Sequence, residues 1–206
     1  YVTGNTVIDA LMMTVAGDYD FGDDLKDVDF HNHRVILLTT HRRENLGEPM
    51  RHIYKALRRI IEEIPDTEIV FPVHRNPVRK VVEEELAGVD RIHLIDPMEY
   101  EPFANLMSLS SLVLTDSGGI QEEAPSLGKP VLVLRNTTER PEAVEAGTVR
   151  LIGTDKDVVY AETKRLLTDQ AAYDAMSNAV NPYGDGKASQ RIVQAILHVF
   201  AGEEAV

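Results

Sequence analysis

The hydrophobic residues of this chain follow two alternating patterns. Short apolar runs rich in β-branched residues, which are typical of buried strands, occur at 35–39, 68–71, 91–95, 111–115, 130–134 and 148–152. Between these runs, helices are predicted at 49–64, 77–87, 102–109, 120–127, 140–146 and 155–167. Further helices are predicted at 3–16, 170–179 and 187–200. This alternation predicts an α/β fold, a Rossmann-like parallel sheet of about six strands with helices on both faces.

Polar segments divide the chain into three expected parts. An acidic stretch at 17–32 separates the first helix from the rest, so residues 1–32 are expected to form a connecting helix and linker. Residues 33–180 then form the Rossmann-like domain, and residues 181–206 form a C-terminal loop and helix. Tyr1 is not an initiator methionine and already stands close to a helical pattern, which suggests a fragment of a longer protein.

Composition excludes several kinds of chemistry. The chain has 206 residues, 34 of them acidic and 21 basic, and it contains no cysteine. The acidic balance argues against general nucleic-acid binding, and the lack of cysteine excludes disulfides, thiolate catalysis and cysteine-based zinc sites. No apolar run is long enough to span a membrane and no signal peptide is recognisable, so a cytoplasmic location is expected. We interpret His31 and His33 as solvated residues at a loop end and expect no metal site.

The segments that follow the predicted strands are the places to look for a ligand. In open α/β sheets, ligands bind beyond the carboxyl ends of the strands. After the first five strands come the segments 41–47, 72–77, 96–103, 116–119 and 135–141. Four of these five carry His, Arg or the free N–H groups of a helix start, on a chain that is otherwise acidic. The pattern predicts an anionic, phosphate-bearing ligand.

The turn at 116–119 is the strongest candidate for a phosphate site. Asp116 or Ser117 can cap the helix that follows, because a short oxygen side chain accepts a hydrogen bond from a free N–H of the first turn. Gly118 and Gly119 have no Cβ, so a ligand can lie against the backbone at the positive end of the helix dipole. Many such turns bind nothing, however, and this one matches neither the dinucleotide fingerprint nor the P-loop.

Two glutamates lie one helical turn after these glycines. Glu122 and Glu123 stand four positions after Gly118 and Gly119, respectively. A carboxylate at that place can accept hydrogen bonds from the paired hydroxyls of a sugar. The spacing alone allows either residue.

Basic residues of the first loops have two interpretations each. His41 can act as an acid or base near neutral pH, or it can cap a helix start. Arg42 and Arg43 can bind phosphates, although one of them can instead pair with Glu44. His74 stands next to Arg75 on a proline-flanked turn, where a structural role is equally open.

Two residues of later loops are similarly open. Phe103 can stack on a base, or it can belong to the core at a helix start. Arg140 can point towards a ligand, or it can pair with Glu142 across a helix turn.

Taken together, these segments resemble the non-hydrolysing UDP-N-acetylglucosamine 2-epimerases. The Ser-Gly-Gly-Ile-Gln-Glu-Glu block combined with Thr-Thr-Glu-Arg-Pro is highly specific for this family. The matching segments run in order over nearly the whole chain, at 2–9, 41–44, 72–77, 115–128, 137–142, 146–148 and 181–186.

The resemblance implies a GT-B architecture, in which two Rossmann-like domains enclose the active site. This chain is similar to the carboxyl-terminal domain with its connecting helix. The family interconverts UDP-GlcNAc and UDP-ManNAc by eliminating UDP to give 2-acetamidoglucal and adding it back, without a metal or nicotinamide cofactor. Its carboxylates for proton transfer at C2 lie in the amino-terminal domain, so this chain alone is expected to be inactive. The resemblance also implies UDP-GlcNAc and UDP as ligands, and a homodimer for the full-length protein.

The resemblance also assigns roles to residues of the nucleotide site. Ser117, Gly118 and Gly119 would hold the diphosphate, and Glu123 would accept hydrogen bonds from the ribose hydroxyls. The segment around Phe103 would flank the uracil.

The basic residues take further roles by the same resemblance. His41 would lie beside the phosphates as a catalytically important residue, with Arg43 near it and Arg140 pointing towards the cleft. In bacterial members, the counterparts of His74 and Arg42 face a second, regulatory UDP-GlcNAc.

Three alternatives remain at this point. A GT-B glycosyltransferase domain would share the nucleotide site, although Thr-Thr-Glu-Arg-Pro together with His-Arg-Arg-Glu argues against it. A hydrolysing epimerase would release free ManNAc and UDP. A nucleotide-sugar-binding module would perform no chemistry.

Overall fold

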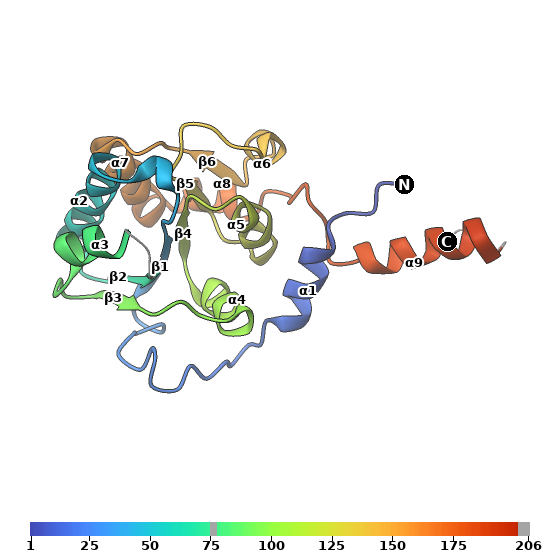
Figure 1. The fold of residues 1–206 in the computed structure, drawn as a ribbon, viewed down its shortest axis with the longest axis horizontal. Coiled ribbons are helices and arrows are strands. Elements are labelled where there is room, and N and C mark those ends of the chain that lie inside the picture. The colour runs from blue at the N-terminus through green and yellow to red at the C-terminus, as the bar shows by residue number, and fades with distance from the viewer. Residues whose placement is uncertain (75–77, 202–206) are drawn as a thin grey trace.

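The computed structural model describes residues 1–74 and 78–201, and it contains a single six-stranded sheet within them (Figure 1). All neighbouring strands are parallel and follow the order β3-β2-β1-β4-β5-β6. The strands are β1 (Arg34–Thr39), β2 (Thr67–Pro72), β3 (Ile92–Ile95), β4 (Leu112–Thr115), β5 (Val131–Val133) and β6 (Val149–Leu151). The predicted Rossmann-like α/β fold is confirmed.

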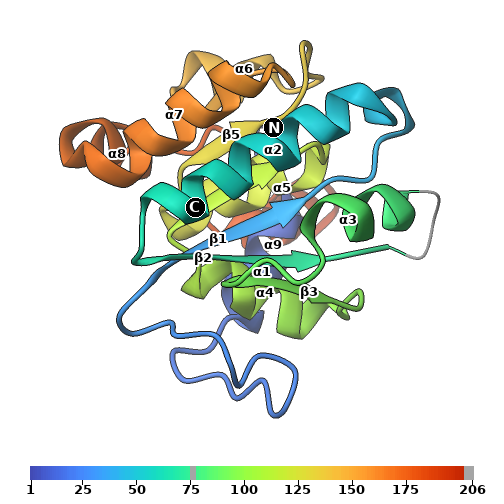
Figure 2. The ribbon, with the colours of Figure 1, turned by 90° about the vertical axis from the view of Figure 1, so that its left-hand side faces the viewer.

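Helices cover both faces of this sheet because successive side chains of a strand point to opposite sides. In β1, Ile36 and Leu38 pack into one apolar cluster, whereas Val35 and Leu37 pack into the other. The first cluster is covered by α2 (Glu48–Glu63), α3 (Val78–Leu86), α7 (Lys156–Thr168) and α8 (Gln170–Ser177). The second is covered by α1 (Thr6–Thr14), α4 (Tyr100–Leu109), α5 (Gly118–Glu123) and α6 (Pro141–Glu145). Figure 2 shows α2 and α3 in front of the strands and α4 behind them.

An arginine from the loop before β3 caps the C-terminal end of α2. The guanidinium of Arg91 donates hydrogen bonds to carbonyls at and beyond that end, those of Ile61, Ile64, Pro65 and Thr67. Its own backbone has a φ of 60°, in the left-handed region that side-chain-bearing residues seldom adopt. These hydrogen bonds satisfy carbonyls that a helix end leaves without intrahelical partners.

A polar cluster joins α2 to α7 on the outer surface. The carboxylate of Glu63 accepts hydrogen bonds from Arg59 Nε and Lys164 Nζ, both at 2.8 Å, and from the hydroxyl of Tyr160. The Arg59 guanidinium also lies over the Tyr160 ring, 3.7 Å from its centroid. The two helices are therefore held together by charge as well as by their apolar faces.

Several element boundaries differ from the predicted ones. Helix α4 begins at Tyr100 rather than at 102, and the helix predicted for 120–127 begins at Gly118. That helix then tightens into a 3-10 turn, η2 (Ala124–Leu127), beside Pro125, which has no N–H to continue an α-helical ladder. A short 3-10 helix, η1 (Arg43–Asn45), was not predicted. The predicted candidate Arg75 and the predicted helix start at Pro77 lie outside the described residues.

The two ends of the chain pack against each other. Asn5 caps α1, and its backbone N–H donates to the carbonyl of Tyr183 at 2.7 Å. The carboxylate of Asp9 accepts from the backbone N–H groups of Ala188 and Ser189, where α9 (Ala188–Ala201) begins. Helix α9 then projects away from the rest of the molecule (Figure 1). The proposed division of the chain into 1–32, 33–180 and 181–206 stays a prediction.

Apolar side chains remain exposed along α9, and Phe200 is 84% exposed. None of the helices in the described part of the chain is long and apolar enough to cross a membrane.

Candidate functional site

The strand order reverses between β1 and β4, which lie side by side in the middle of the sheet. From β1 the chain winds outwards through β2 and β3, and from β4 it winds outwards through β5 and β6. The loops that follow β1 and β4 therefore separate at this point, and the crevice between them is where open α/β sheets bind ligands.

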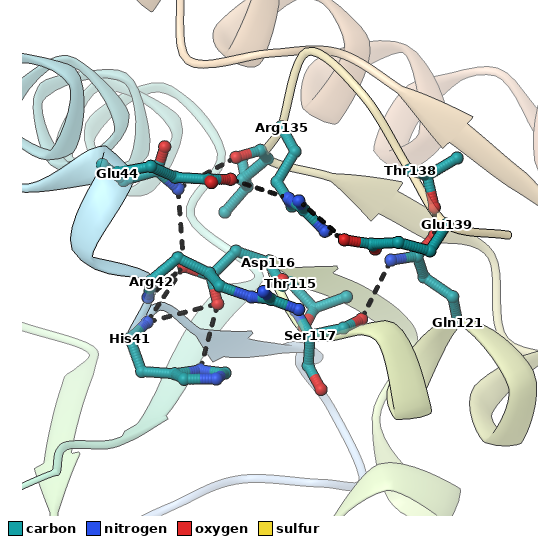
Figure 3. Close-up of polar contacts among 12 residues, drawn as sticks. His41, Arg42, Glu44, Thr115, Asp116, Ser117, Gln121, Arg135, Thr138 and Glu139 are labelled. Carbon is teal, nitrogen blue, oxygen red and sulfur yellow. Dashed lines mark hydrogen bonds and ion pairs between the residues drawn. The ribbon is translucent and has the colours of Figure 1, made fainter.

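The carboxylate of Asp116 joins these two loops (Figure 3). Its Oδ2 atom accepts hydrogen bonds from the backbone N–H groups of His41 and Arg42, each at 2.9 Å. Its Oδ1 atom lies 3.0 Å from Nδ1 of the His41 ring, and Nδ2 of Asn45 approaches Oδ2 at 3.4 Å. The residue is completely buried. One carboxylate thus fixes the start of the loop after β1.

These contacts correct the predicted capping role of Asp116. The N-cap of α5 is Ser117, and no side chain makes a capping hydrogen bond there. Asp116 is turned instead towards the loop after β1, where two backbone N–H groups and an imidazole converge on it. Burial would raise the pKa of Asp116, but the hydrogen bonds from His41 and Arg42 outweigh it and lower the pKa below its usual value. The buried carboxylate is therefore ionised.

The turn at Ser117 and the two glycines leaves the start of α5 open. A Cβ built on Gly118 would have no other atom within 4 Å, and one built on Gly119 would meet only Oε2 of Glu123, at 4.0 Å. The first N–H groups of a helix have no intrahelical acceptor. This end of α5 therefore has both the space and the hydrogen-bond donors that an anion needs.

Glu122 and Glu123 are both buried but differ in their partners. Asn5 Nδ2 donates to Oε2 of Glu122, and Arg140 Nε donates to Oε1, so both oxygens are occupied. Glu123 accepts only from the Tyr100 hydroxyl, at 3.1 Å on Oε1, and Oε2 has no hydrogen-bond partner among the described residues. Burial raises the pKa of Glu123, although the bond from Tyr100 partly opposes this shift. Glu123 therefore has one oxygen without a partner among the described residues, whereas each oxygen of Glu122 already accepts a hydrogen bond.

A cavity of about 160 Å³ lies in front of β1 and β4. It brings together four of the predicted site residues, His41, His74, Phe103 and Ser117. The rings of His41 and His74 are 5.8 Å apart between centroids. Phe103 also packs against the apolar cluster under α4, so it belongs both to the core and to the cavity wall.

A larger cavity of about 550 Å³ shares Pro97 and Met98 with this one. It is lined by four carboxylates, those of Asp23, Asp24, Asp96 and Glu99. Such a lining repels phosphate, so the smaller cavity at the switch point is the better candidate for an anionic ligand.

A buried arginine links the loops after β1 and β5, as Figure 3 shows. Arg135 donates from Nε to Glu44 at 2.8 Å, and from Nη1 and Nη2 to Glu139 at 2.7 and 3.1 Å. The predicted pairing of Glu44 with Arg42 or Arg43 is therefore wrong, because Glu44 turns to the loop after β5. Sequence reasoning did not single out Arg135, although a charged residue directly after an apolar strand was a usable signal.

A second link connects α5 to the same loop. Gln121 Nε2 donates to the carbonyl of Ser117 at 3.0 Å, and its Oε1 accepts from the Thr138 hydroxyl at 2.6 Å (Figure 3). The turn at 116–119 is thus fixed from both neighbouring loops.

The remaining arginines lie differently from one another. Arg42 donates from Nε to the backbone carbonyl of Asp116 at 3.3 Å, while Arg43 is exposed on η1. Of the two interpretations of Arg140, the pairing with Glu142 is wrong. Arg140 binds Glu122, and Glu142 accepts a hydrogen bond from the Tyr183 hydroxyl at 3.1 Å. Arg140 thereby stands beside the glutamate pair of α5.

The histidines at the end of the acidic linker are not both solvated. Nδ1 of His33 lies 2.5 Å from Oε1 of the buried Glu68, whose Oε2 lies 2.6 Å from Nε2 of His93. Only His31 remains exposed as expected. Within residues 1–74 and 78–201, no group of three or more His, Cys, Asp or Glu side chains is arranged to hold a metal ion.

Comparison with known proteins gives consistent matches. The sequence profile of the family described as UDP-N-acetylglucosamine 2-epimerase matches residues 1–197. The chain is 54% identical over 204 residues to the Bacillus subtilis protein of that name, covering 96% of this chain and 51% of that protein. For the Escherichia coli K12 protein the identity is 52% over 210 residues, covering 95% and 54%. The chain thus spans about half the length of the curated relatives it matches.

Solved structures give the same result. Staphylococcus aureus MnaA, in a structure with UDP, matches with a TM-score of 0.89 at 52% identity, covering 97% of this chain and 54% of that one. The UDP-GlcNAc 2-epimerase of Neisseria meningitidis bound to UDP-GlcNAc matches with a TM-score of 0.84 at 46% identity, covering 95% and 54%.

Proposed function

The chain belongs to the UDP-N-acetylglucosamine 2-epimerase family, and we propose that it supplies the nucleotide-binding half of an isomerase that interconverts UDP-GlcNAc and UDP-ManNAc. The reaction would eliminate UDP from the sugar and add it back after C2 has changed configuration. The observation that carries the proposal is the open start of α5 at the topological switch point, beside His41 and the free acceptor of Glu123. Relatives that contain UDP or UDP-GlcNAc support the choice of ligand.

Within this proposal, the diphosphate of UDP binds the hydroxyl of Ser117 and the N–H groups of Gly118 and Gly119, because the N–H of Ser117 already donates to the Thr115 hydroxyl at 2.9 Å. The ribose hydroxyls donate to Glu123, whose Oε2 has no other partner among the described residues. The uracil lies against the wall that contains Phe103. The direction of the helix dipole and the space above Gly118 support this orientation.

The chemical role of these residues follows from the leaving group. As the bond between C1 and the phosphate oxygen breaks, its electron pair stays on the oxygen, so negative charge grows on the diphosphate. Fixed N–H groups, the His41 ring and the cationic residues Arg43 and Arg140 stabilise that charge more in the transition state than in the ground state. The proton on C2 leaves and returns through carboxylates that the family resemblance assigns to the other half of the enzyme.

The finer parts of the proposal are tested by product analysis of the full-length protein. A non-hydrolysing enzyme gives UDP-ManNAc, a hydrolysing one gives free ManNAc and UDP, and a glycosyltransferase gives neither without an acceptor. His74 and Arg42 are proposed to face a second, regulatory UDP-GlcNAc, and a cooperative rate curve that becomes hyperbolic in His74→Ala would support this role. The cytoplasmic location and the homodimer stay predictions, and sedimentation of the full-length protein tests the second.

The binding site itself is tested by calorimetry with UDP on this chain. Gly118→Val places a branched side chain in the open space where the phosphate is proposed to lie, and should abolish measurable binding. Gly17→Val is the matched control, because a Cβ on Gly17 also meets no atom within 4 Å but lies in the linker. Unchanged UDP affinity in folded Gly118→Val would contradict the proposed phosphate site.

A further inference from the structure

The buried carboxylate of Asp116 contacts the imidazole of His41 as well as the backbone of its loop. The Nδ1–Oδ1 distance is 3.0 Å, and the backbone N–H of the same histidine donates to Oδ2 at 2.9 Å. Backbone and ring of His41 are therefore held by one fully buried group. The ring itself lines the cavity together with Ser117.

The chemistry of a carboxylate determines which ring nitrogen carries the proton. Asp116 receives two backbone N–H groups and an asparagine amide besides the ring, so it is the acceptor in each contact. An ionised carboxylate can only accept hydrogen bonds, so Nδ1 of His41 must be the donor. Nε2 is then the nitrogen left to interact with a ligand.

We infer that Asp116 is a positioning residue for His41, holding the imidazole by Nδ1 so that Nε2 meets the diphosphate of the bound nucleotide. This inference rests on the proposed UDP site. Phosphate oxygens only accept hydrogen bonds, so Nε2 must carry a proton when it meets the diphosphate, and the ring then lies between two anions, Asp116 and the diphosphate.

Other charged or titratable groups around the ring do not supply the same interaction. The ring of His74 lies 5.8 Å from the ring of His41 between centroids, and no hydrogen bond joins these two described side chains. Arg42 directs Nε to the carbonyl of Asp116 at 3.3 Å. Among the described residues, Asp116 alone has an ion-pair contact with the His41 ring.

The experiment compares the chain with its Asp116→Asn and His41→Gln variants. The side-chain oxygen of asparagine can still accept from the backbone N–H groups of His41 and Arg42, while its amide donates to Nδ1 of the ring. The ring should then change tautomer, from Nδ1–H to Nε2–H, which ¹⁵N chemical shifts of labelled histidine report directly. This measurement needs no ligand.

Calorimetry of UDP binding in buffers of different ionisation enthalpy supplies the second measurement. At a pH where the ¹⁵N shifts show the free ring to be neutral, the unmodified chain should take up about one proton per UDP more than Asp116→Asn does, since the variant ring already donates from Nε2. His41→Gln should lack the same uptake, and adding Asp116→Asn to it should change nothing further. A role of Asp116 in folding alone would leave this difference in proton uptake unexplained.

The outcomes separate the inference from the proposed function. A free ring in the unmodified chain that carries a proton on Nε2 and none on Nδ1 would overturn the inference, even if Asp116→Asn did not fold. Equal proton uptake in the unmodified chain and Asp116→Asn would overturn it as well. A chain that shows the Nδ1–H tautomer but does not bind UDP would instead contradict the proposed function.

Discussion

At the scale of single residues, adjacent side chains of the same type have different roles. Glu122 is occupied by Asn5 and Arg140, and so joins the N-terminal segment to the loop after β5. Glu123 accepts one hydrogen bond, from the Tyr100 hydroxyl, and its Oε2 atom has no hydrogen-bond partner among the described residues. The first residue therefore stabilises the fold, and the second is available for a ligand.

Replacing these glutamates separately should separate binding from stability. Hydrogen bonds to a charged group are worth roughly 1.5–3 kcal/mol, so Glu123→Ala should weaken UDP binding by about ten- to a hundredfold. Glu122→Ala should lower the melting temperature, because Arg140 loses its partner, with a smaller effect on affinity. Calorimetry and thermal unfolding measure the two effects. A larger loss of affinity in Glu122→Ala would show that the ribose contact is assigned to the wrong residue.

At the scale of elements, charged side chains join parts of the fold that the backbone ladder does not connect. Arg135 ties η1 to the loop after β5, and Glu63 ties α2 to α7. The two links differ in burial, since Arg135 is only 6% exposed while Glu63 lies on the surface. Their response to mutation should differ accordingly.

The buried Arg135 should contribute more to stability than a cation in an exposed ion pair. Arg135→Met keeps much of the side-chain volume but removes its three hydrogen bonds to Glu44 and Glu139. Because both glutamates are more than half exposed and regain water, the free energy of unfolding should fall by only about 1–2 kcal/mol. Lys26→Met, which breaks an exposed pair with Asp23, should lower it by less than about 0.5 kcal/mol. Urea denaturation of both variants tests this order.

The Glu63 cluster should make stability depend on pH. Hydrogen bonds from Lys164, Tyr160 and Arg59 lower the pKa of Glu63 to about 2, from an ordinary value of 4.5. The folded state then binds fewer protons than the unfolded state, so this contribution is complete above pH 4.5 and is lost as pH falls towards 2. The stability difference between the unmodified chain and Glu63→Gln should shrink over that window in denaturation experiments. Glu62→Gln is the matched control, because Glu62 makes no ion pair among the described residues.

Local patterns predicted the elements well, whereas partners distant in the sequence could not be read from them. Each strand was predicted to within a residue or two, because burial on both faces of a parallel sheet leaves a clear apolar run. The proposed pairs of Glu44 and Arg140 were wrong, since spacing along a helix reveals only neighbours on that helix. Glu44 meets Arg135, which is 91 positions away.

The misassigned role of Asp116 has a similar cause. A short acidic side chain before a helix is typical of an N-cap, and the sequence contains no sign of a competing donor. The strand order 3-2-1-4-5-6 brings the loop after β1 beside that side chain, and the two N–H groups of His41 and Arg42 bind it instead. The order of strands, which the periodicity does not determine, decided the role of this residue.

At the scale of the whole molecule, the proposed nucleotide site is accompanied by little acid–base machinery among the described residues. The residues that line the cavity at the switch point include histidines but, among those described, no Asp or Glu. Two carboxylates that follow β4 have other uses, since Asp116 is bound to the loop after β1 and Glu123 is proposed to hold ribose. General acid–base catalysis at C2 needs groups within hydrogen-bond reach on the sugar.

The 206-residue chain should therefore bind UDP without converting UDP-GlcNAc. Binding should be weaker than in a full-length relative, because the second wall of the GT-B cleft is missing and charge interactions are weaker in water. Incubation with UDP-GlcNAc in deuterated water tests this expectation. Deuterium at C2, or UDP-ManNAc among the products, would show that this half carries proton-transfer groups of its own. The full-length protein is the positive control.

The net charge of the chain and the exposed apolar face of α9 have opposite effects on the association of its copies in solution. The net charge of −13 keeps copies apart, whereas exposed apolar residues such as Val193, Ile196 and Phe200 favour contact. Charge repulsion reaches about 30 Å at 0.01 M salt but only about 3 Å at 1 M, while the apolar attraction is not screened. The osmotic second virial coefficient should therefore change from positive to negative as salt rises, and Phe200→Lys should shift that crossover to higher salt. The colloidal behaviour of the molecule thus depends on the net charge of the whole chain and on one helix whose side chains are mostly exposed.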